Sequence, residues 1–562
     1  MLIPSLLLFL AALPSPASSN AGSQNPAATP QAPEAWARAV EQGRALIAEG
    51  KSEEARLLLQ AADQADAGAL RTRVWYIRAL IEDEFLNDAL NFTDDLGAAG
   101  HEGPQLDYLY GMSFVYKARK YIRQSVDLSM VGMNFRDAIA FLASATSADP
   151  VRYGDAFLPL AEAAWNSQQL DVARQAAASA TRFAPKSGAA FYMLGEIAFS
   201  QYVVANADEA LAEEAQGHWQ TTFDAFQTAA KLEDRDAGDE GLLASSLNKA
   251  GDALVWVGRK EEAATQYARA LGASPAAVDI GQLYRTLDAQ AFDKCITQGE
   301  AEFNQRHDPA DPGDATLLWW IGYTKYARGE YEEARTEFEK AYAKWPASAS
   351  SKWYVALCHH QLGDIEAATD TVIALQAADA VALNEALIAD PSRTLPFLDI
   401  LVAHCFAQGR LTDAGRLSAA QGNASPDTPR YWNNVGLFYR DAGVNLPRAA
   451  DGKAVEDQEL QRKYFEKSYE GYSRALALAA DDPLILNDTA VVLHYFLDRD
   501  LERARKMYAL ANELSRNALK TDMLTAEERP LIQKAMDDSS KNLVIIDRTI
   551  AERAQRRKAQ DS

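Results

Sequence analysis

The chain has 562 residues, a formal net charge of −23 at pH 7 and an isoelectric point of about 4.8. A surface this acidic repels phosphate backbones, so we expect no nucleic-acid partner and favour a neutral or basic one. Hydrophobic residues make up 48% and charged residues 24% of the chain, so most of it is expected to fold. One hydrophobic core rarely organises a chain of this length, whereas an array of repeats has no such limit.

Residues 1–19 predict a secretory signal peptide. The run from Leu2 to Leu13 is apolar apart from Pro4 and Ser5, and small residues at 15–17 offer a cleavage site. No Lys or Arg precedes the apolar run, which departs from the usual pattern and would also follow from a wrongly assigned start codon. We expect export, to the periplasm or cell envelope or outside the cell. The run is shorter than the roughly 20 residues of a spanning helix, and no later stretch reaches that length, so no integral membrane domain is expected.

Residues 20–33 are rich in Ser, Pro and Ala, and this composition predicts a disordered leader. Residues 34–277 then show small residues at a spacing of 34: Ala89 follows Ala55, and Gly195 follows Ala161, by this interval. Insertions are expected to lengthen the connection between paired helices in the third repeat and over 203–217. Residues 278–314 keep an amphipathic pattern without the small residues, and we interpret them as a degenerate repeat.

Residues 315–514 repeat the same spacing most clearly. Gly329 and Gly363 lie 34 residues apart, as do Ala334 and Ala368, and a further insertion is expected over 444–463. Apolar and small residues alternate at helical spacing in the unit that contains Leu318, Ile321, Gly322, Tyr326, Gly329, Tyr331, Ala334, Phe338, Ala341 and Pro346. This unit closely resembles the consensus of the tetratricopeptide repeat.

The resemblance implies an all-α fold, an α-solenoid that winds as a right-handed superhelix of about twelve helix-turn-helix repeats. Helical insertions interrupt the array, and residues 515–562 are expected to form a capping helix with a basic tail. Within 525–558, apolar residues recur at helical intervals, and a polar outer face is expected there.

The sequence contains no P-loop, HExxH, CxxC or GxSxG motif, so we expect neither an enzyme nor a cofactor. Three cysteines occur, Cys295, Cys358 and Cys405. Cys358 and Cys405 adjoin histidines in neighbouring repeats, which favours core packing and leaves a metal site or a Cys358–Cys405 disulfide as alternatives.

The first helix of each repeat forms the concave wall in the tetratricopeptide family, at the second, fifth, ninth, twelfth and thirteenth positions. Carried onto this chain, those positions give an unusually aromatic set, and Tyr and Trp are typical interface anchors. For each residue, packing against the next repeat remains an alternative to partner binding. The set comprises Tyr108, Trp165, Tyr192, Asn248, Asp252, Trp256, Trp319, Tyr323, Tyr326, Trp353, His360, Asn433 and Arg440.

Four basic residues, Lys117, Arg119, Lys120 and Arg123, interrupt the acidic sequence and form a candidate anion contact. A solvated extension of the helix is the favoured interpretation.

We therefore predict a non-enzymatic scaffold that binds an extended or helical segment of a protein partner in an aromatic groove. The first alternative is a structural component of the cell envelope that assembles as a homo-oligomer. The second is a carrier or enzyme with an unrecognised site.

Overall fold

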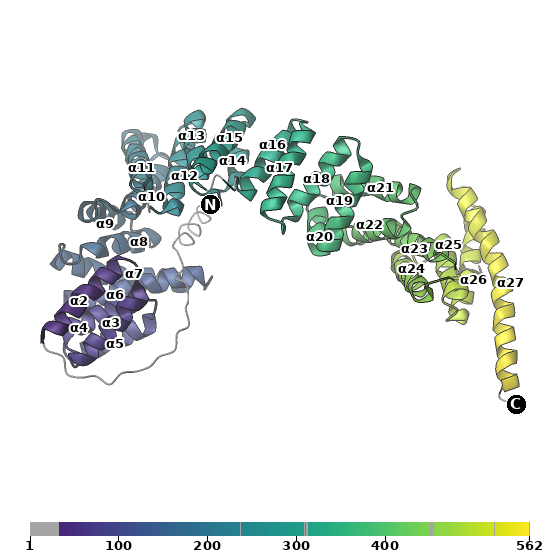
Figure 1. Ribbon diagram of the computed structural model, residues 1–562, viewed down its shortest axis with the longest axis horizontal. Coiled ribbons are helices and arrows are strands. Elements are labelled where there is room, and N and C mark those ends of the chain that lie inside the picture. The colour runs from purple at the N-terminus through teal and green to yellow at the C-terminus, as the bar shows by residue number, and fades with distance from the viewer. Residues whose placement is uncertain are drawn as a thin grey trace. The chain divides into compact units, whose positions relative to one another are not determined.

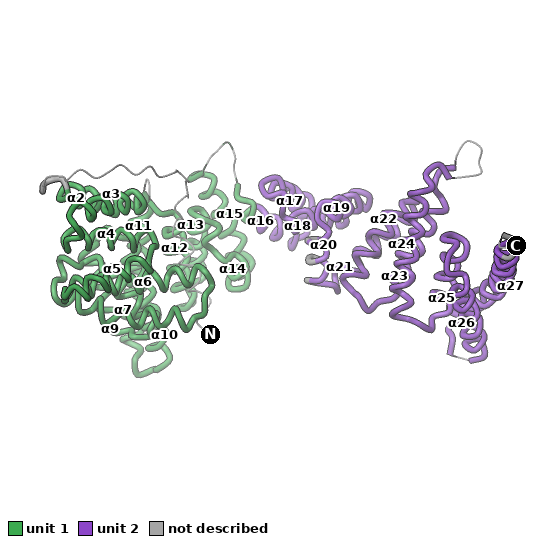
Figure 2. Tube along the Cα trace, turned by 90° about the horizontal axis from the view of Figure 1, so that it is seen from below, with its two compact units in different colours: residues 1–317 green, residues 318–562 purple. Residues whose placement is uncertain are grey.

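The computed structural model describes residues 33–560, apart from 236–237, 308–309, 311–312, 449–454 and 522. The predicted signal peptide, and the leader up to residue 32, lie outside the described residues. The chain divides into two compact units, residues 1–317 and 318–562 (Figure 2). Each unit is a succession of α-helices (Figure 1). Within the described ranges the only extended pairing is an isolated bridge between Arg448 and Val455.

Unit 1 consists of α-helices with three short 3-10 turns between them. These elements are α2 (Pro33–Ala48), α3 (Ser52–Ala65), α4 (Leu70–Glu82), α5 (Leu86–Ala98), α6 (Pro104–Arg123), α7 (Leu128–Ala148), η1 (Gly154–Ala156), α8 (Phe157–Asn166), α9 (Leu170–Phe183), α10 (Gly188–Ala205), η2 (Glu209–Leu211), α11 (Ala212–Glu233), α12 (Glu240–Trp256), α13 (Lys260–Ala273), η3 (Pro275–Ala277), α14 (Ile280–Thr286) and α15 (Ala289–Arg306).

Unit 2 continues from within α16. Its elements are α16 (Ala315–Ala327), α17 (Tyr331–Lys344), α18 (Ala349–Gln361), α19 (Ile365–Ala378), α20 (Ala380–Ala389), α21 (Pro391–Ala407), α22 (Leu411–Ala424), α23 (Pro429–Val444), α24 (Gln458–Leu478), α25 (Pro483–Val491), the π-helical segment η4 (Val492–Phe496), α26 (Leu501–Leu519) and α27 (Glu528–Gln560).

Each helix packs mainly against its neighbours in sequence, as α2 does with α3, α12 with α13, and α25 with α26. This is the contact pattern of a solenoid, in which each repeat is stabilised by the repeats beside it. The predicted all-α solenoid is therefore confirmed, while its membership of the tetratricopeptide family and the handedness of its superhelix stay predictions. In the degenerate stretch, α15 packs far more extensively on α13 than on the short α14.

Glycines on the first helix of a repeat let a large residue of the second helix pack against the backbone. A Cβ atom built on Gly195 would lie 2.7 Å from Phe226, and one built on Gly436 would lie 2.5 Å from Tyr472. Real Cβ atoms do not approach so closely, so any larger residue would push the paired helices apart. The small-residue positions of the repeat follow from this contact.

Left-handed residues end several first helices. Glycine holds this position in the turns that contain Gly50, Gly258, Gly329, Gly363 and Gly409, whose φ values run from 69° to 82°. Glu84 (φ 60°) and Gln168 (φ 61°) hold it where the sequence has no glycine. The turn geometry is therefore kept even where the residue disfavours it, because the packing of the two helices fixes it.

In the third repeat the insertion extends the helices themselves, which corrects the expectation that it lengthens their connection. The insertion expected over 444–463 does lengthen a connection, because residues 445–457 lie between α23 and α24. In the third repeat, α6 and α7 run to 20 and 21 residues, and only residues 124–127 join them. Likewise α11 and α24 reach 22 and 21 residues. An amphipathic helix that continues one or two turns keeps its period, so the added residues gain backbone hydrogen bonds that a loop would lack.

Three further features of unit 2 were not expected. Helix α20 is an additional element between α19 and α21, and it buries Leu383 and Leu387. Gly443, 34 residues after Gly409, does not end a helix; it lies inside the lengthened α23 and packs against Phe465. The capping helix α27 is present and buries Ile546, but Val544 and Ile545 are exposed, so its outer face is not wholly polar.

None of the described helices combines the length and the apolar character required to cross a bilayer.

Candidate partner-binding pockets

Unit 2 contains a cavity of about 370 Å³ on the face formed by its first helices. We call it the aromatic pocket. Its walls come from α16, α18 and α21, the first helices of three repeats, together with the residue before α21. The lining residues are Tyr323, Tyr326, Ala327, Trp353, Tyr354, Leu357, His360, Gln361, Asp390, Arg393, Pro396, Phe397 and Ile400.

The rings of this pocket pack edge to face. Tyr354 presents its ring to Tyr323 and Tyr326 at centroid distances of 5.8 and 5.5 Å, and Trp353 meets Phe397 at 5.4 Å. Perpendicular packing brings the positive edge of one ring to the negative face of another, which holds the walls in fixed orientations. Trp353 is largely buried, so it forms part of the wall more than of the open surface.

Polar groups lie among these rings. Burial raises the pKa of Tyr354 to about 12 and also raises that of Tyr326, so both phenols stay protonated at neutral pH. Nδ1 of His360 is buried and has no hydrogen-bond partner among the described residues. Nε of Arg393 lies 3.9 Å from Oδ2 of Asp390, so this part of the lining carries a pair of opposite charges.

Trp319 supports the aromatic pocket from outside its lining. Its ring stacks on Tyr323 at 5.5 Å, with an interplanar angle of 5°, and meets Tyr354 edge to face at 5.4 Å. The structure therefore brings together four residues of the predicted wall, with Tyr323, Tyr326 and Trp353 in the lining and Trp319 behind Tyr323.

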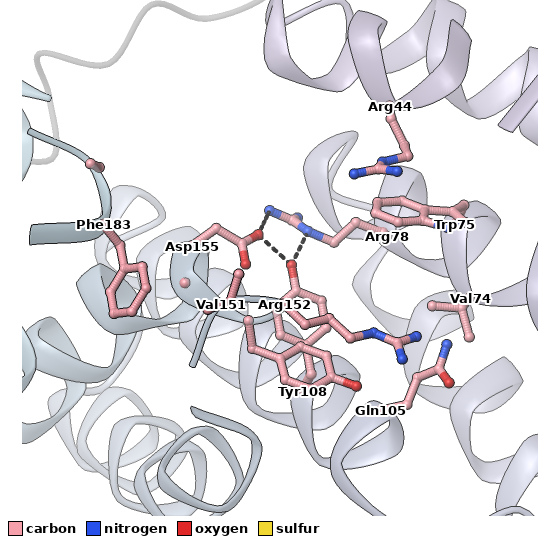
Figure 3. Close-up of a pocket in the computed structure, with 13 residues that line it drawn as sticks. Arg44, Val74, Trp75, Arg78, Gln105, Tyr108, Val151, Arg152, Asp155 and Phe183 are labelled. Carbon is pink, nitrogen blue, oxygen red and sulfur yellow. Dashed lines mark hydrogen bonds and ion pairs between the residues drawn. The ribbon is translucent and has the colours of Figure 1, made fainter. Parts of the chain in front are cut away.

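Unit 1 contains a second cavity of about 370 Å³, which we call the arginine pocket (Figure 3). It lies against α2, α4 and α6, again the first helices of successive repeats, and is closed by residues 151–155 and the end of α9. Its lining residues are Arg44, Val74, Trp75, Arg78, Gln105, Tyr108, Val151, Arg152, Tyr153, Gly154, Asp155, Phe183 and Ala184.

Arg78 is the centre of a buried polar network in this pocket (Figure 3). Its Nε donates to the hydroxyl of Tyr108 at 2.8 Å, and that hydroxyl donates to Asp155 at 2.5 Å. Its Nη2 lies 2.5 Å from Glu82. Burial disfavours the charged guanidinium, but Tyr108, Glu82 and Asp155 outweigh burial and raise the pKa of Arg78, so it remains protonated. Burial is the main cause that raises the pKa of Tyr108.

The arginines of this pocket were not predicted from the sequence, although a signal for two of them exists. Arg44 and Arg78 lie 34 residues apart and both occupy the ninth position of the repeat, one residue after Gly43 and Ile77 respectively. That position belongs to the inner wall in the tetratricopeptide family. Arg152 precedes α8 in a connecting segment, where the repeat pattern gives no position to read.

The remaining predicted wall residues line neither pocket. Tyr192 is buried and packs edge to face on Phe226. Nε1 of Trp165 donates to Ser200 at 3.0 Å, and Asp252 accepts a hydrogen bond from Tyr267 at 2.8 Å. Asn248 and Asn433 are half-buried, Trp256 is exposed, and Arg440 lies 2.9 Å from Asp441 and 3.5 Å from Asp488.

The candidate anion contact lies on the second half of α6 and has partners within unit 1. Arg119 pairs with the buried carboxylate of Glu162, and Arg123 pairs with Glu84. Lys120 donates to the backbone oxygen of Glu84 at 3.1 Å, and Lys117 lies over the ring of Tyr121. An anion bound here would have to compete with these contacts.

Cys295, Cys358 and Cys405 are buried free thiols, so the alternative of a Cys358–Cys405 disulfide is wrong. Burial raises the pKa of Cys295 and Cys358 to about 12 and that of Cys405 to about 11. These cysteines pack as small apolar residues. No group of three or more candidate metal ligands was found among the residues for which the structure gives a position.

No model of a known protein family matches the sequence, and no curated protein matches it. Among solved structures, the chain is similar to the apo form of RapI, at 13% identity and a TM-score of 0.35, over 70% of this chain and 97% of that one. It is also similar to the P58(IPK) TPR domain, at 14% identity and a TM-score of 0.18, over 77% of this chain and 97% of that one. A third similar structure is TTC0263, a TPR protein in Thermus thermophilus, at 20% identity and a TM-score of 0.18, over 40% of this chain and 98% of that one. Likenesses this distant assign neither a partner nor a function to the chain.

Proposed function

We propose that this protein is a non-enzymatic interaction scaffold, exported to the cell envelope, that holds an extended or helical segment of a protein partner against its first helices. The observation that carries the proposal is the aromatic pocket, which gathers Tyr323, Tyr326, Trp353 and His360 from α16 and α18 and adds Phe397 from α21. A stack of helix pairs presents an extended surface for binding, and this pocket is a place on that surface where a partner side chain can bind.

The composition of the aromatic pocket suits a side chain of the partner. Interface energy concentrates in a few aromatic anchors that sit in well-packed pockets. A cavity of about 370 Å³ accepts one or two large side chains, while the polar edges of Tyr326, His360 and Arg393 orient the backbone that carries them. An apolar or aromatic anchor on the partner is therefore the expected occupant.

The test is to identify the partner by crosslinking the full chain in its own envelope and then to measure its affinity for variants. Tyr326→Ala and His360→Ala alter the pocket with little effect on the core, because both residues are only partly buried. Each should weaken binding by about tenfold. Trp345→Ala is the matched control, since Trp345 is 56% exposed and lies at the end of α17, outside the pocket. Equal affinity of all three variants would contradict the proposal.

Self-association is the second candidate, and helix α27 favours it. A terminal capping helix normally presents a polar outer face, yet Leu531, Val544 and Ile545 are exposed on this one. Light scattering over a range of concentrations tests the idea. A mass that grows with concentration, and that Val544→Glu abolishes, would support self-association; a constant monomer mass would exclude it.

A further inference from the structure

The arginine pocket holds more guanidinium groups than carboxylates. Arg44, Arg78 and Arg152 line it together with Asp155, and Glu82 pairs with Arg78 from outside the lining. Among the lining residues three guanidinium groups therefore accompany a single carboxylate, in a chain whose net charge is −23. We infer that the arginine pocket binds a carboxylate carried by the partner peptide. This inference rests on the proposed function only in taking a peptide as the source of the carboxylate.

Two of the three guanidinium groups have no carboxylate partner among the described residues. The guanidinium of Arg44 lies over the ring of Trp75, 4.6 Å from its centroid (Figure 3). The guanidinium of Arg152 lies 5.4 Å from the centroid of Tyr153. A guanidinium stacked on a ring keeps its N–H edge free in the plane, and that edge binds a carboxylate in bidentate fashion. Arg44 and Arg152 are both exposed, so a ligand can reach them.

The third guanidinium adds an unmet donor. Arg78 is 6% exposed, and its Nη1 is buried without a hydrogen-bond partner among the described residues. A buried donor left unpaired is costly, so native structures normally provide an acceptor. A ligand oxygen, directly or through a bridging water, would supply this acceptor.

The charge and shape of the pocket favour a carboxylate over a phosphate. The carboxylates of Asp155 and Glu82 already offset part of the positive charge and oppose a second negative charge on the ligand, so the pocket favours a monoanion over a dianion. The walls formed by Trp75, Tyr153 and Phe183 accept an apolar group beside the carboxylate. An acidic residue next to an apolar one, or a C-terminal apolar residue, has this chemistry.

Isothermal titration calorimetry on the full chain tests the inference with four probes. N-acetylphenylalanine presents a terminal carboxylate, and N-acetylglutamyl-phenylalaninamide presents a side-chain carboxylate. N-acetylphenylalaninamide is the neutral control, and inorganic phosphate is the alternative anion. At least one carboxylate probe should bind, and the tighter of the two identifies the source of the carboxylate. The inference is overturned if neither binds, if the neutral amide binds equally, or if phosphate binds more tightly.

Variants place the binding in the arginine pocket. The double variant Arg44→Gln, Arg152→Gln should weaken binding of the carboxylate probe by about a hundredfold or more, because each of the two lost charge-assisted hydrogen bonds contributes about tenfold or more. Arg174→Gln, an exposed change on α9 outside the pocket, is the matched control, and circular dichroism checks that all variants fold. Unchanged binding in the double variant would overturn the inference.

The same experiment separates this inference from the proposed function. Tyr326→Ala should leave probe binding unchanged, since Tyr326 belongs to the aromatic pocket. If the probes fail to bind while the partner still depends on Tyr326, the carboxylate site falls and the scaffold stands. If the probes bind and no partner depends on Tyr326, the carboxylate site stands and the proposed scaffold function falls.

Discussion

Gly251 and Tyr267 are in contact between α12 and α13, so closely that a Cβ atom on Gly251 would lie 2.5 Å from Cε1 of Tyr267. Tyr267 is fully buried and donates its hydroxyl to Asp252 at 2.8 Å, so its ring cannot move aside without losing that bond. This contact is the unit from which the array is built, because it fixes how near the two helices of a repeat lie.

Gly251→Ala should therefore destabilise unit 1 by about 1–3 kcal/mol, the usual cost of overpacking a core. Hydrogen exchange of the α12 and α13 peptides measures the effect. Gly132→Ala is the matched control: Gly132 also lies within a helix, α7, but a Cβ atom there meets nothing within 4 Å. The control variant should be more stable than the parent chain by up to about 1 kcal/mol, because alanine has a higher helix propensity than glycine. A neutral result at Gly251 would show that the helices separate freely.

Gln168 is strained in the left-handed region, with φ at 61° in the turn between α8 and α9. Gln168→Gly should stabilise the fourth repeat by about 1 kcal/mol, because glycine adopts this conformation without the Cβ penalty. Gln169→Gly is the control, since Gln169 has φ at −91° and glycine there adds only unfolded-state entropy. Thermal unfolding of the two variants should move in opposite directions; a loss of stability at both positions would count against the strain.

Asp252 gives unit 1 a pH dependence. Burial raises the pKa of this carboxyl group from 3.8 to about 6. The positive charge of Lys249 and the hydrogen bond from Tyr267 lower the pKa, but by less than burial raises it. The folded state then holds the proton more tightly than the unfolded state, so this group's contribution to stability is present at low pH and is lost as the pH rises through about 6.

Asp252→Asn removes this titration. Relative to the parent chain, the variant should gain about 2 kcal/mol in opening free energy between roughly pH 4.5 and pH 7.5. Hydrogen exchange of α12 at the two pH values measures the difference. A constant difference across this range would mean that Asp252 is already ionised in the folded protein at low pH.

Arg119 and Glu162 form a buried ion pair between α6 and α8. The glutamate is 5% exposed, so Glu162→Gln would leave the guanidinium charged in a buried site without its counter-ion. We expect a loss of about 3–5 kcal/mol in the free energy of unfolding, measured by denaturant titration. The exposed pair of Arg259 and Glu262 provides the comparison, and Glu262→Gln should leave the stability unchanged. Similar effects from the two variants would contradict the assigned burial.

The spacing of small residues was enough to predict the paired helices, because a glycine such as Gly251 and a large residue such as Tyr267 mark where two helices touch. It predicted helical insertions but placed that of the third repeat in the connection between the helices, since added turns of an amphipathic helix keep the helical period and do not show where the helix ends. It also missed α20, whose Leu383 and Leu387 belong to no consensus position.

The candidate sites show the same division. Tyr323, Tyr326, Trp353 and His360 were found from their positions in the repeat, and the structure places all of them in one cavity. Their role in binding stays a prediction. The arginine pocket was not predicted, because Arg152 comes from a connecting segment that has no position in the repeat. In addition, only tertiary contacts show which arginines pair with a carboxylate and which do not.

Site-specific photo-crosslinking tests whether a protein partner binds the first-helix face of unit 2. A photoreactive amino acid would replace Tyr326 on the first-helix face or Trp345 outside it, with both full-length variants expressed in the native cells. We expect a protein partner to be captured from position 326 and not from position 345. Capture from position 345 alone, or from neither position, would contradict the claim that the first helices form the binding surface.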